Sequence, residues 1–399
     1  MSEVLLNEVC DLIVDCPHST ANDEGKGYPL VRTPNIGKGR LIYNGMHRVS
    51  EEVYNKRNLR AVPQEGDLIF AREATAGNVA LIQKGEKVCL GQRTVLIRPN
   101  KKYVNPAFLT YFLLAPKQQY NLLSTANGAT VAHLNMPTIR NLKLELPNIQ
   151  IQNCIATILS RYDSLIENYQ KQIKLLEEAA QRLYKEWFVD LHFPGHENTN
   201  IVDGVPEGWK KKRLGDIVKT TSGGTPSRSN SNYYSGNIMW VKTKELMDGF
   251  IFDTEEKVTQ EAINKSSAKI VPKASILLAM YGATIGKLGI ASKDLSCNQA
   301  CCVFLLSKDN PLRWYLFNWL LLNREFLISQ GKGAAQPNLS QDMIKKFELV
   351  VPDDNTLLSY HRLVNVFYMK SKSLQSQIRL LTEARDRLLP KLMSGEIAV

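Results

Sequence analysis

The chain has 399 residues, a net charge of +11 and a hydrophobic fraction of 44%, a composition that excludes an intrinsically disordered protein and predicts two or three globular domains. No run of about 18 uncharged apolar residues occurs, so we expect no membrane-spanning helix, and the acidic stretch at 1–14 does not fit a secretory signal. The seven cysteines and six histidines lack zinc-binding spacing, which predicts free thiols in a reducing, cytoplasmic compartment and no metal site.

The first predicted domain covers residues 1–148 and mixes helices with strands. Apolar runs at 67–71 and 95–97 predict buried strands, and the apolar run at 109–115 predicts a short helix after Pro106.

A single long helix is predicted for residues 149–188, because neither proline nor glycine interrupts this segment. Its apolar residues recur in steps of three and four, which is a heptad seam with one extra residue near Tyr169. The residues of this seam are Ile151, Ile155, Ile158, Tyr162, Leu165, Tyr169, Ile173, Leu176, Ala180, Leu183 and Trp187. Residues 189–208 follow as a connector, whose prolines and glycines predict a loop.

The second predicted domain covers residues 209–352, with strands at 275–279 and 302–306 and a short helix at 314–322. A second long helix is predicted for 353–392, followed by a tail at 393–399. Asp353 and Asp354 suit the positive N-terminus of that helix. Ser371 and Arg385 weaken its apolar stripe, and we expect Pro390 to end it.

The two halves of the chain repeat one another at an offset of 205 residues. The offset pairs QIKLL (172–176) with QIRLL (377–381), and it also pairs Leu134 with Leu339. Such a long period predicts two copies of one domain-plus-helix unit. The predicted fold class is α+β: two globular mixed α/β domains in tandem pseudo-repeat, separated by two long helices that pair as an antiparallel coiled coil. Separate packing of each helix on its own domain stays an alternative.

The positive charge lies on the two domains and not on the helices. Residues 1–148 have a net charge of +5 and residues 209–352 of +8, whereas residues 149–188 have a net charge of 0 and the connector of −4. Two basic modules on a near-neutral helical element suit a long anionic ligand that is contacted twice. Duplex DNA fits this description, because neutralised phosphates supply its sequence-independent affinity.

The sequence contains no catalytic constellation that we can recognise. Residues 282–288 resemble a phosphate-binding loop, but three residues separate the glycines instead of four, and Leu288 occupies the position of the magnesium-binding Ser or Thr. The Asn/Asp-Pro-Pro-Tyr/Phe motif of amino-methyltransferases, which holds a flipped base, is absent. We therefore expect a non-catalytic protein.

At this point the chain resembles a known family, the specificity (S) subunits of type I restriction–modification systems. The resemblance covers nearly the whole chain, through the tandem repeat, the two long helices and five short stretches. These stretches are FVDLHFPG (188–195), VPEGWK (205–210), TSGGTP (221–226), YGATIGK (281–287) and LPKLMSGEI (389–397).

The resemblance implies two target recognition domains, each reading one half of a split DNA sequence from the major groove. The helices would be the central and C-terminal spacers, which fix the gap between half-sites and dock two modification (methyltransferase) subunits. Those subunits would supply S-adenosylmethionine and adenine methylation, and restriction subunits would cleave DNA with ATP and magnesium. This chain would itself hold no cofactor.

Polar and basic residues near the loops are the predicted DNA contacts, because such side chains reach phosphates and base edges. The first domain departs from the family pattern, since DCPHST (15–20) stands there in place of TSGGTP. In the first domain the predicted contacts are Arg32, Thr33, Arg72, Asn78, Thr130 and His133. In the second they are Thr221, Ser222, Lys242, Thr243, Lys244, Tyr281, Lys287, Gln336 and Asn338.

Two alternatives stay open. The chain could serve a methylation-only defence complex that has no nuclease, which this sequence cannot distinguish. It could also be a basic coiled-coil adaptor for protein or RNA, an alternative that predicts no sequence-dependent, salt-sensitive binding to duplex DNA.

Overall fold

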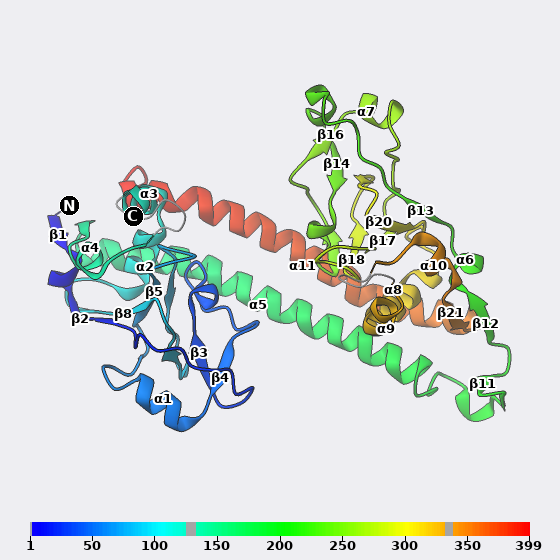
Figure 1. Ribbon diagram of the computed structural model, residues 1–399, viewed down its shortest axis with the longest axis horizontal. Helices are drawn as coiled ribbons and strands as arrows, with labels where there is room; N and C mark the ends of the chain where they lie inside the picture. The colour runs from blue at the N-terminus through cyan, green and yellow to red at the C-terminus, as the bar shows by residue number, and fades with distance from the viewer. Residues whose placement is uncertain (1, 125–132, 332–337) are drawn as a thin grey trace. The chain divides into compact units, whose positions relative to one another are not determined.

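The computed structural model describes residues 2–124, 133–331 and 338–399 (Figure 1). Its contacts divide the chain into unit 1, which is Met1–Glu167 with Leu380–Val399, and unit 2, which is Asn168–Arg379. The two long helices, α5 (Ile149–Phe188) and α11 (Asp354–Ser394), each contribute one part to each unit.

The other named elements of unit 1 precede α5. They are β1 (Ser2–Leu5), η1 (Leu6–Val9), β2 (Cys10–Asp15), β3 (Tyr28–Val31), η2 (Thr33–Asn35), β4 (His47–Val49), α1 (Glu51–Arg57), β5 (Leu68–Ala71), β6 (Val79–Leu81), β7 (Cys89–Leu90), β8 (Thr94–Pro99), α2 (Pro106–Leu114), α3 (Pro116–Ser124), α4 (Met136–Arg140) and β9 (Lys143–Leu146).

Unit 1 is built around a sheet that is buried on both faces. Among the described residues its strand order is β2-β8-β5-β6, and smaller sheets pair β4-β3-β7 and β1-β9. Alternate residues of a strand face opposite sides, so Leu68 and Phe70 enter the core beneath α2 and α5, while Ile69 and Ala71 enter a second core. Burial on both faces explains the uninterrupted apolar run from which this strand was predicted.

The other named elements of unit 2 lie between α5 and α11. The connector holds η3 (His196–Asn198), β10 (Ile201–Val202) and β11 (Val205–Pro206). The rest are β12 (Lys210–Arg213), α6 (Leu214–Ile217), β13 (Thr220–Ser222), η4 (Ser231–Tyr234), β14 (Ile238–Val241), η5 (Thr243–Glu245), β15 (Gly249–Ile251), β16 (Lys257–Val258), α7 (Gln260–Asn264), β17 (Ile276–Ala279), β18 (Leu288–Ala291), β19 (Ser296–Cys297), β20 (Cys301–Phe304), α8 (Leu312–Leu322), α9 (Arg324–Ser329), α10 (Gln341–Lys346) and β21 (Glu348–Val351).

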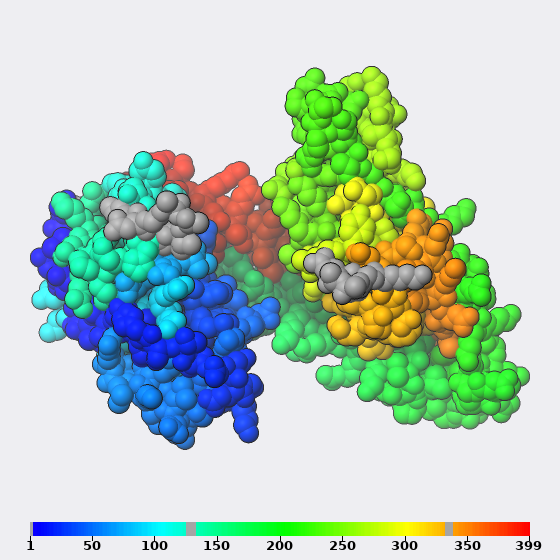
Figure 2. Space-filling view, viewed as in Figure 1, coloured from blue at the N-terminus to red at the C-terminus, as the bar shows by residue number. Residues whose placement is uncertain are grey.

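Unit 2 repeats the topology of unit 1, which confirms the predicted tandem repeat. Its described strands order as β13-β20-β17-β18-β15, β16-β14-β19 and β12-β21. The parallel pair β3·β7 recurs as β14·β19. Strand β15 pairs parallel with β18, where unit 1 forms a parallel bridge between Gly39 and Ala80. Strands β14 and β16 and helix α7 project from the rest of unit 2 (Figures 1 and 2).

Helix α5 has the predicted bounds, but its buried stripe differs from the predicted seam. Leu165 is exposed, whereas the polar residues Gln152 and Asp163 are buried. The shift arises because the first half of α5 packs against the core of unit 1 together with the end of α11. The seam prediction was therefore wrong at Leu165, whereas Ile151, Ile155 and Ile158 lie in or against this core as predicted.

The long helices contact each other within each unit, with opposite chain directions. In unit 1, Arg385 Nη1 of α11 donates to Asp163 Oδ1 of α5 at 2.6 Å. In unit 2, Ser371 Oγ donates to Glu177 Oε1 at 3.4 Å, and Tyr360 Oη donates to the carbonyl of Ala180. Ser371 and Arg385, which interrupt the apolar stripe, thus form polar contacts between the helices.

The expectation that Pro390 ends the second helix was wrong, since α11 continues to Ser394 and the tail begins at Gly395. Proline removes one backbone hydrogen bond from a helix. The burial of Leu392, with Leu388, Leu389 and Met393 packed against the same core, offsets that loss. At its start α11 is capped as predicted, because the Asp353 carboxylate accepts hydrogen bonds from the backbone N–H of Asn355 and Thr356.

The connector 189–208 is more ordered than the predicted loop. It contains η3 and a hairpin in which β10 pairs with β11. Asp203 and Gly204 both have positive φ, the conformation that a two-residue hairpin turn requires. Gly204 is one of the glycines from which the loop was predicted, and in the structure it is one of the two residues of this hairpin turn.

Candidate nucleic-acid interface

In unit 1 the loop between β5 and β6 (residues 72–78, the β5–β6 loop) is hydrogen-bonded to the segment after β3. Thr75 Oγ1 donates to the carbonyl of Thr33, and Asn78 Nδ2 donates to the carbonyl of Ile36, each at 3.0 Å. Arg32 Nη2 donates to the carbonyl of Gly45 at 3.2 Å. The structure thus brings the predicted contacts Arg32, Thr33 and Asn78 together, although the Thr33 side chain is buried.

Arg72 is 9% exposed and makes contacts inside the unit. Its Nε donates to the carbonyl of Leu134 at 2.9 Å, its Nη1 to Asp15 Oδ2 at 2.7 Å, and its Nη2 lies 3.2 Å from His133 Nε2. Since Arg72 can only donate, His133 Nε2 is assigned as acceptor, and Nδ1–H then donates to Glu73 at 2.7 Å. Arg72 therefore holds the β5–β6 loop next to residue 133.

Unit 2 has a cluster of cations and carboxylates on its projecting part. Lys242 forms ion pairs with Glu255 and Glu256, and Lys244 pairs with Glu255 at 2.5 Å. The guanidinium of Arg228 lies 4.2 Å from the ring centroid of Tyr234 and pairs with Glu256 at 2.8 Å. The predicted contacts Lys242 and Lys244 thus lie close together, and carboxylates partly neutralise their charges.

The pKa values follow from these pairs. The hydrogen bond from Lys244 lowers the pKa of Glu255 below its ordinary value. Burial alone would raise the pKa of Glu256, but hydrogen bonds from Lys242 and Arg228 lower it. The bond to Glu256 raises the pKa of Lys242, so Lys242, Glu255 and Glu256 are charged at neutral pH.

The loop between β17 and β18 (residues 280–287, the β17–β18 loop) carries a second group of ion pairs. Lys287 Nζ donates to Asp248 Oδ2 at 2.8 Å, and Arg324 Nη2 donates to Asp248 Oδ1. Tyr281 is half-buried in this loop, and Asn338 is exposed. The backbone N–H of Leu339 donates to the carbonyl of Met280 at 2.8 Å, which places Asn338 beside the start of the loop.

The motif at 221–226 owes its glycines to close packing. A Cβ on Gly223 would lie 2.1 Å from the carbonyl oxygen of Cys297, and one on Gly224 would lie 2.3 Å from the carbonyl carbon of Ser267. These glycines let backbone segments approach each other, so close packing accounts for both of them. Thr221 and Ser222 lie on β13, and Lys269 Nζ donates to Thr221 Oγ1 at 3.2 Å.

Backbone hydrogen bonds establish which residues of the two units are equivalent. The Leu134 N–H donates to the carbonyl of Arg72 as the Leu339 N–H donates to that of Met280. Arg72 therefore corresponds to the buried Met280. The pairs Arg32/Lys242, Thr33/Thr243, Asn78/Lys287 and His133/Asn338 occupy equivalent positions.

Two of the predicted contacts, Thr130 and Gln336, lie outside the described residues. Several residues of the candidate interface were not predicted from the sequence. They are Arg93, Gln119, Arg228, Lys269 and Arg324. The offset of 205 residues pairs Gln119 with Arg324, and this pairing is the signal that could have identified both.

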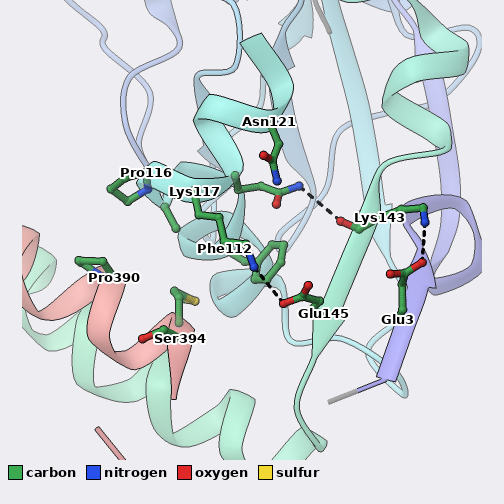
Figure 3. Close-up of a pocket in the computed structure, with 12 residues that line it drawn as sticks. Glu3, Phe112, Pro116, Lys117, Asn121, Lys143, Glu145, Pro390 and Ser394 are labelled. Carbon is green, nitrogen blue, oxygen red and sulfur yellow. Dashed lines mark hydrogen bonds and ion pairs between the residues drawn. The ribbon is translucent and has the colours of Figure 1, made fainter. Parts of the chain in front are cut away.

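A pocket of about 310 Å³ lies in unit 1, and its lining includes none of the residues named above for the candidate interface (Figure 3). Its wall includes two ion pairs, Lys143 with Glu3 at 2.7 Å and Lys117 with Glu145 at 3.2 Å. Because these charged groups already have partners, we assign no ligand to it. Within residues 2–124, 133–331 and 338–399 no three His, Cys, Asp or Glu side chains could hold a metal ion together. No described helix has the length and hydropathy needed to cross a membrane.

Comparison with known proteins agrees with the repeated fold. The family model of the type I restriction modification DNA specificity domain matches residues 1–178 and 206–356. The chain belongs to this family. The MjaIX specificity subunit of a type I restriction enzyme from Methanocaldococcus jannaschii is 27% identical over 94% of this chain and 88% of its own. The HindI specificity subunit from Haemophilus influenzae is 23% identical over 84% and 87%.

A solved structure shows the same fold. The S subunit of a type I restriction–modification system from M. genitalium aligns with 98% of this chain and 95% of its own, with a TM-score of 0.62 at 16% identity. Family members of this kind are specificity subunits, which are non-catalytic components of a complex. The predicted family membership is therefore confirmed.

Proposed function

We propose that this chain is the DNA-reading specificity subunit of a type I restriction–modification complex, and that each unit reads one half of a bipartite site. The observation that carries the proposal is the repeat itself. In both units the predicted contacts occupy equivalent backbone positions, but the side chains at these positions differ. Lys242 replaces Arg32, and Lys287 replaces Asn78. One scaffold with two sets of polar side chains suits the reading of two different half-sites.

The remaining parts of the proposal concern the helices and partners. Helices α5 and α11 would pair along their whole length as an antiparallel coiled coil, in line with the contacts in each unit. This element would set the gap between half-sites and dock two modification subunits in the cytoplasm. S-adenosylmethionine would be held by those subunits, and ATP and magnesium by restriction subunits, so this chain would supply recognition and no chemistry.

The test is methylation of a randomised duplex library by the complex reconstituted with its modification subunits. We expect modified sites to share two short motifs separated by a fixed gap. Exchanging residues 209–352 for the corresponding domain of a relative should change one motif and leave the other. A binding pattern without sequence dependence would refute the proposal and favour the adaptor alternative.

A pair of lysines tests the interface directly. Lys244→Ala removes an exposed lysine of the candidate interface, and Lys117→Ala removes an exposed lysine at the pocket of Figure 3; each is paired with one glutamate. If Lys244 contacts a phosphate, its loss should weaken binding equally across sequences and reduce the salt slope by about one. The Lys117 variant should bind as the wild type does, and equal effects would contradict the placement of the interface.

A further inference from the structure

The loop of each unit that bears predicted DNA contacts is held by one side chain from a neighbouring helix. In unit 1, Gln119 Nε2 of α3 donates to the carbonyl of Gly77 at 2.9 Å. In unit 2, Arg324 Nε of α9 donates to the carbonyl of Gly286 at 2.9 Å. The anchored carbonyl belongs in both units to the residue directly before a predicted contact, Asn78 or Lys287.

Both anchored glycines need their lack of a side chain. Gly77 has a φ of +87° and Gly286 a φ of +79°, a conformation that L-residues rarely adopt. A Cβ on Gly77 would lie 2.8 Å from Gln119 Oε1, and one on Gly286 would lie 3.0 Å from Arg324 Cγ. The anchor thus packs directly over the turn, so its side chain determines where the turn lies.

The anchors differ in what else they bind. Gln119 Nε2 also donates to the carbonyl of Leu113, near the end of the preceding helix α2, at 2.6 Å. Arg324 instead reaches Asp248, which in turn holds Lys287. Asp248 occupies in unit 2 the position of Gly39 in unit 1. The backbone N–H of each residue donates to the carbonyl of the first residue of the neighbouring strand, and both residues have positive φ.

In unit 2 the contact residue Lys287 is held through ion pairs, whereas its counterpart Asn78 is held by a hydrogen bond to a backbone carbonyl. Asp248 accepts from Lys287, from Arg324 and from the backbone N–H of Leu288, the last at 3.0 Å. The planar guanidinium holds Nε and Nη2 in fixed directions toward the Gly286 carbonyl and the Asp248 carboxylate, whereas the donors of a lysine all share one freely rotating nitrogen. The direction of the Lys287 side chain therefore depends on Arg324.

We propose that Gln119 and Arg324 are positioning residues for DNA recognition, each setting the geometry of the loop that its own unit presents to one half-site. The proposal rests on the proposed function, because it assigns the two anchors to the two half-sites. Neither side chain needs to touch DNA itself. Each acts through the turn and the contact residue beside it.

The experiment compares Arg324→Ala, Arg324→Gln, Arg324→Lys and Gln119→Ala in the full chain, within the reconstituted methyltransferase, on the randomised library. We expect Arg324→Ala to lower base selectivity on the order of tenfold at one half-site and leave the other unchanged. Gln119→Ala is the reciprocal control and should affect the opposite half-site. Arg324→Gln copies the unit 1 anchor and should recover part of the selectivity, because it restores the bond to the Gly286 carbonyl but not the ion pair with Asp248. Arg324→Lys, which lacks the planar pair of donors, should recover less.

The outcomes separate the two proposals. If the wild type selects no bipartite motif, the proposed function fails. If it selects one, but the alanine variants affect both half-sites equally or neither, the positioning role is refuted. Arg324→Gln behaving as badly as Arg324→Ala would also refute it. Thermal unfolding of each variant identifies a loss of fold, and Arg324→Gln decides the question if Arg324→Ala unfolds.

Discussion

Glu177 should make the stability of unit 2 depend on pH in the neutral range. This carboxyl lies on α5, half-buried against α11, where Ser371 donates to it. Burial raises its pKa from 4.5 to about 7, and the charge of Asp248 acts in the same direction. The folded-state pKa therefore lies above the unfolded one, so the favourable contribution is fully present below pH 4.5 and is lost as the pH rises through about 7.

The magnitude follows from the pKa difference. A change from 4.5 to about 7 corresponds to at most about 3 kcal/mol, and solvent screening of a half-buried group reduces this to about 1–2 kcal/mol. Glu177→Gln removes the ionisation and keeps the shape and a hydrogen-bond acceptor. We expect it to raise the free energy of unfolding by about 1–2 kcal/mol at pH 8 and to change it little at pH 4.5.

Urea unfolding followed by tryptophan fluorescence measures this effect, since all five tryptophans belong to unit 2. Glu178→Gln is the matched control, because Glu178 is the adjacent, exposed glutamate of the same helix. Its variant should follow the pH profile of the wild type. Equal stabilisation by Glu177→Gln at both pH values, or the same pH-dependent gain in Glu178→Gln, would refute the reasoning.

Three further predictions concern stability, each measured by urea or thermal unfolding. Arg385→Ala should cost about 3 kcal/mol, because it leaves the buried Asp163 carboxylate without its cation; a loss below about 1 kcal/mol would contradict this. Arg313 is 2% exposed, burial lowers its pKa to about 10, and no carboxylate of the described residues forms an ion pair with it. Arg313→Met should therefore leave the free energy of unfolding unchanged or raise it by about 1 kcal/mol. A decrease above about 2 kcal/mol would contradict the inference that the Arg313 charge is uncompensated. Gly223→Ala should cost more than about 2 kcal/mol because of the clash with Cys297, whereas Gly282→Ala, which has open space but a φ of +84°, should cost about 1 kcal/mol.

The long-range organisation of the fold could be predicted because the chain repeats itself. The bounds of α5 followed from the absence of helix breakers, and the buried strands β5 and β17 from their apolar runs. Local rules failed where packing overrides them. Pro390 stays within α11 because neighbouring leucines are buried, and Asp163 is buried although a heptad seam should be apolar.

The candidate site was harder to predict, because its contacts join residues that are distant in sequence. Asp248 and Arg324 are 76 positions apart, and Arg72 and Asp15 are 57 apart. Residue type alone placed Arg72 among the DNA contacts, although in the structure its guanidinium is buried in internal bonds. Charge indicated a candidate surface, but not which of its cations are already neutralised by a carboxylate.

The polar contact between Asp163 and Arg385 has a consequence for how half-chains could assemble. The offset of 205 residues relates Asp163 to Tyr368 and Arg385 to Ala180. If two copies of the first half paired in place of one complete chain, Asp163 would meet Ala180 and remain buried without a cation, at a cost of several kcal/mol. In two copies of the second half, Arg385 would face Tyr368 and would lose its carboxylate partner. The residue differences at these four positions therefore favour one complete chain with two unlike halves over a pair of identical half-chains.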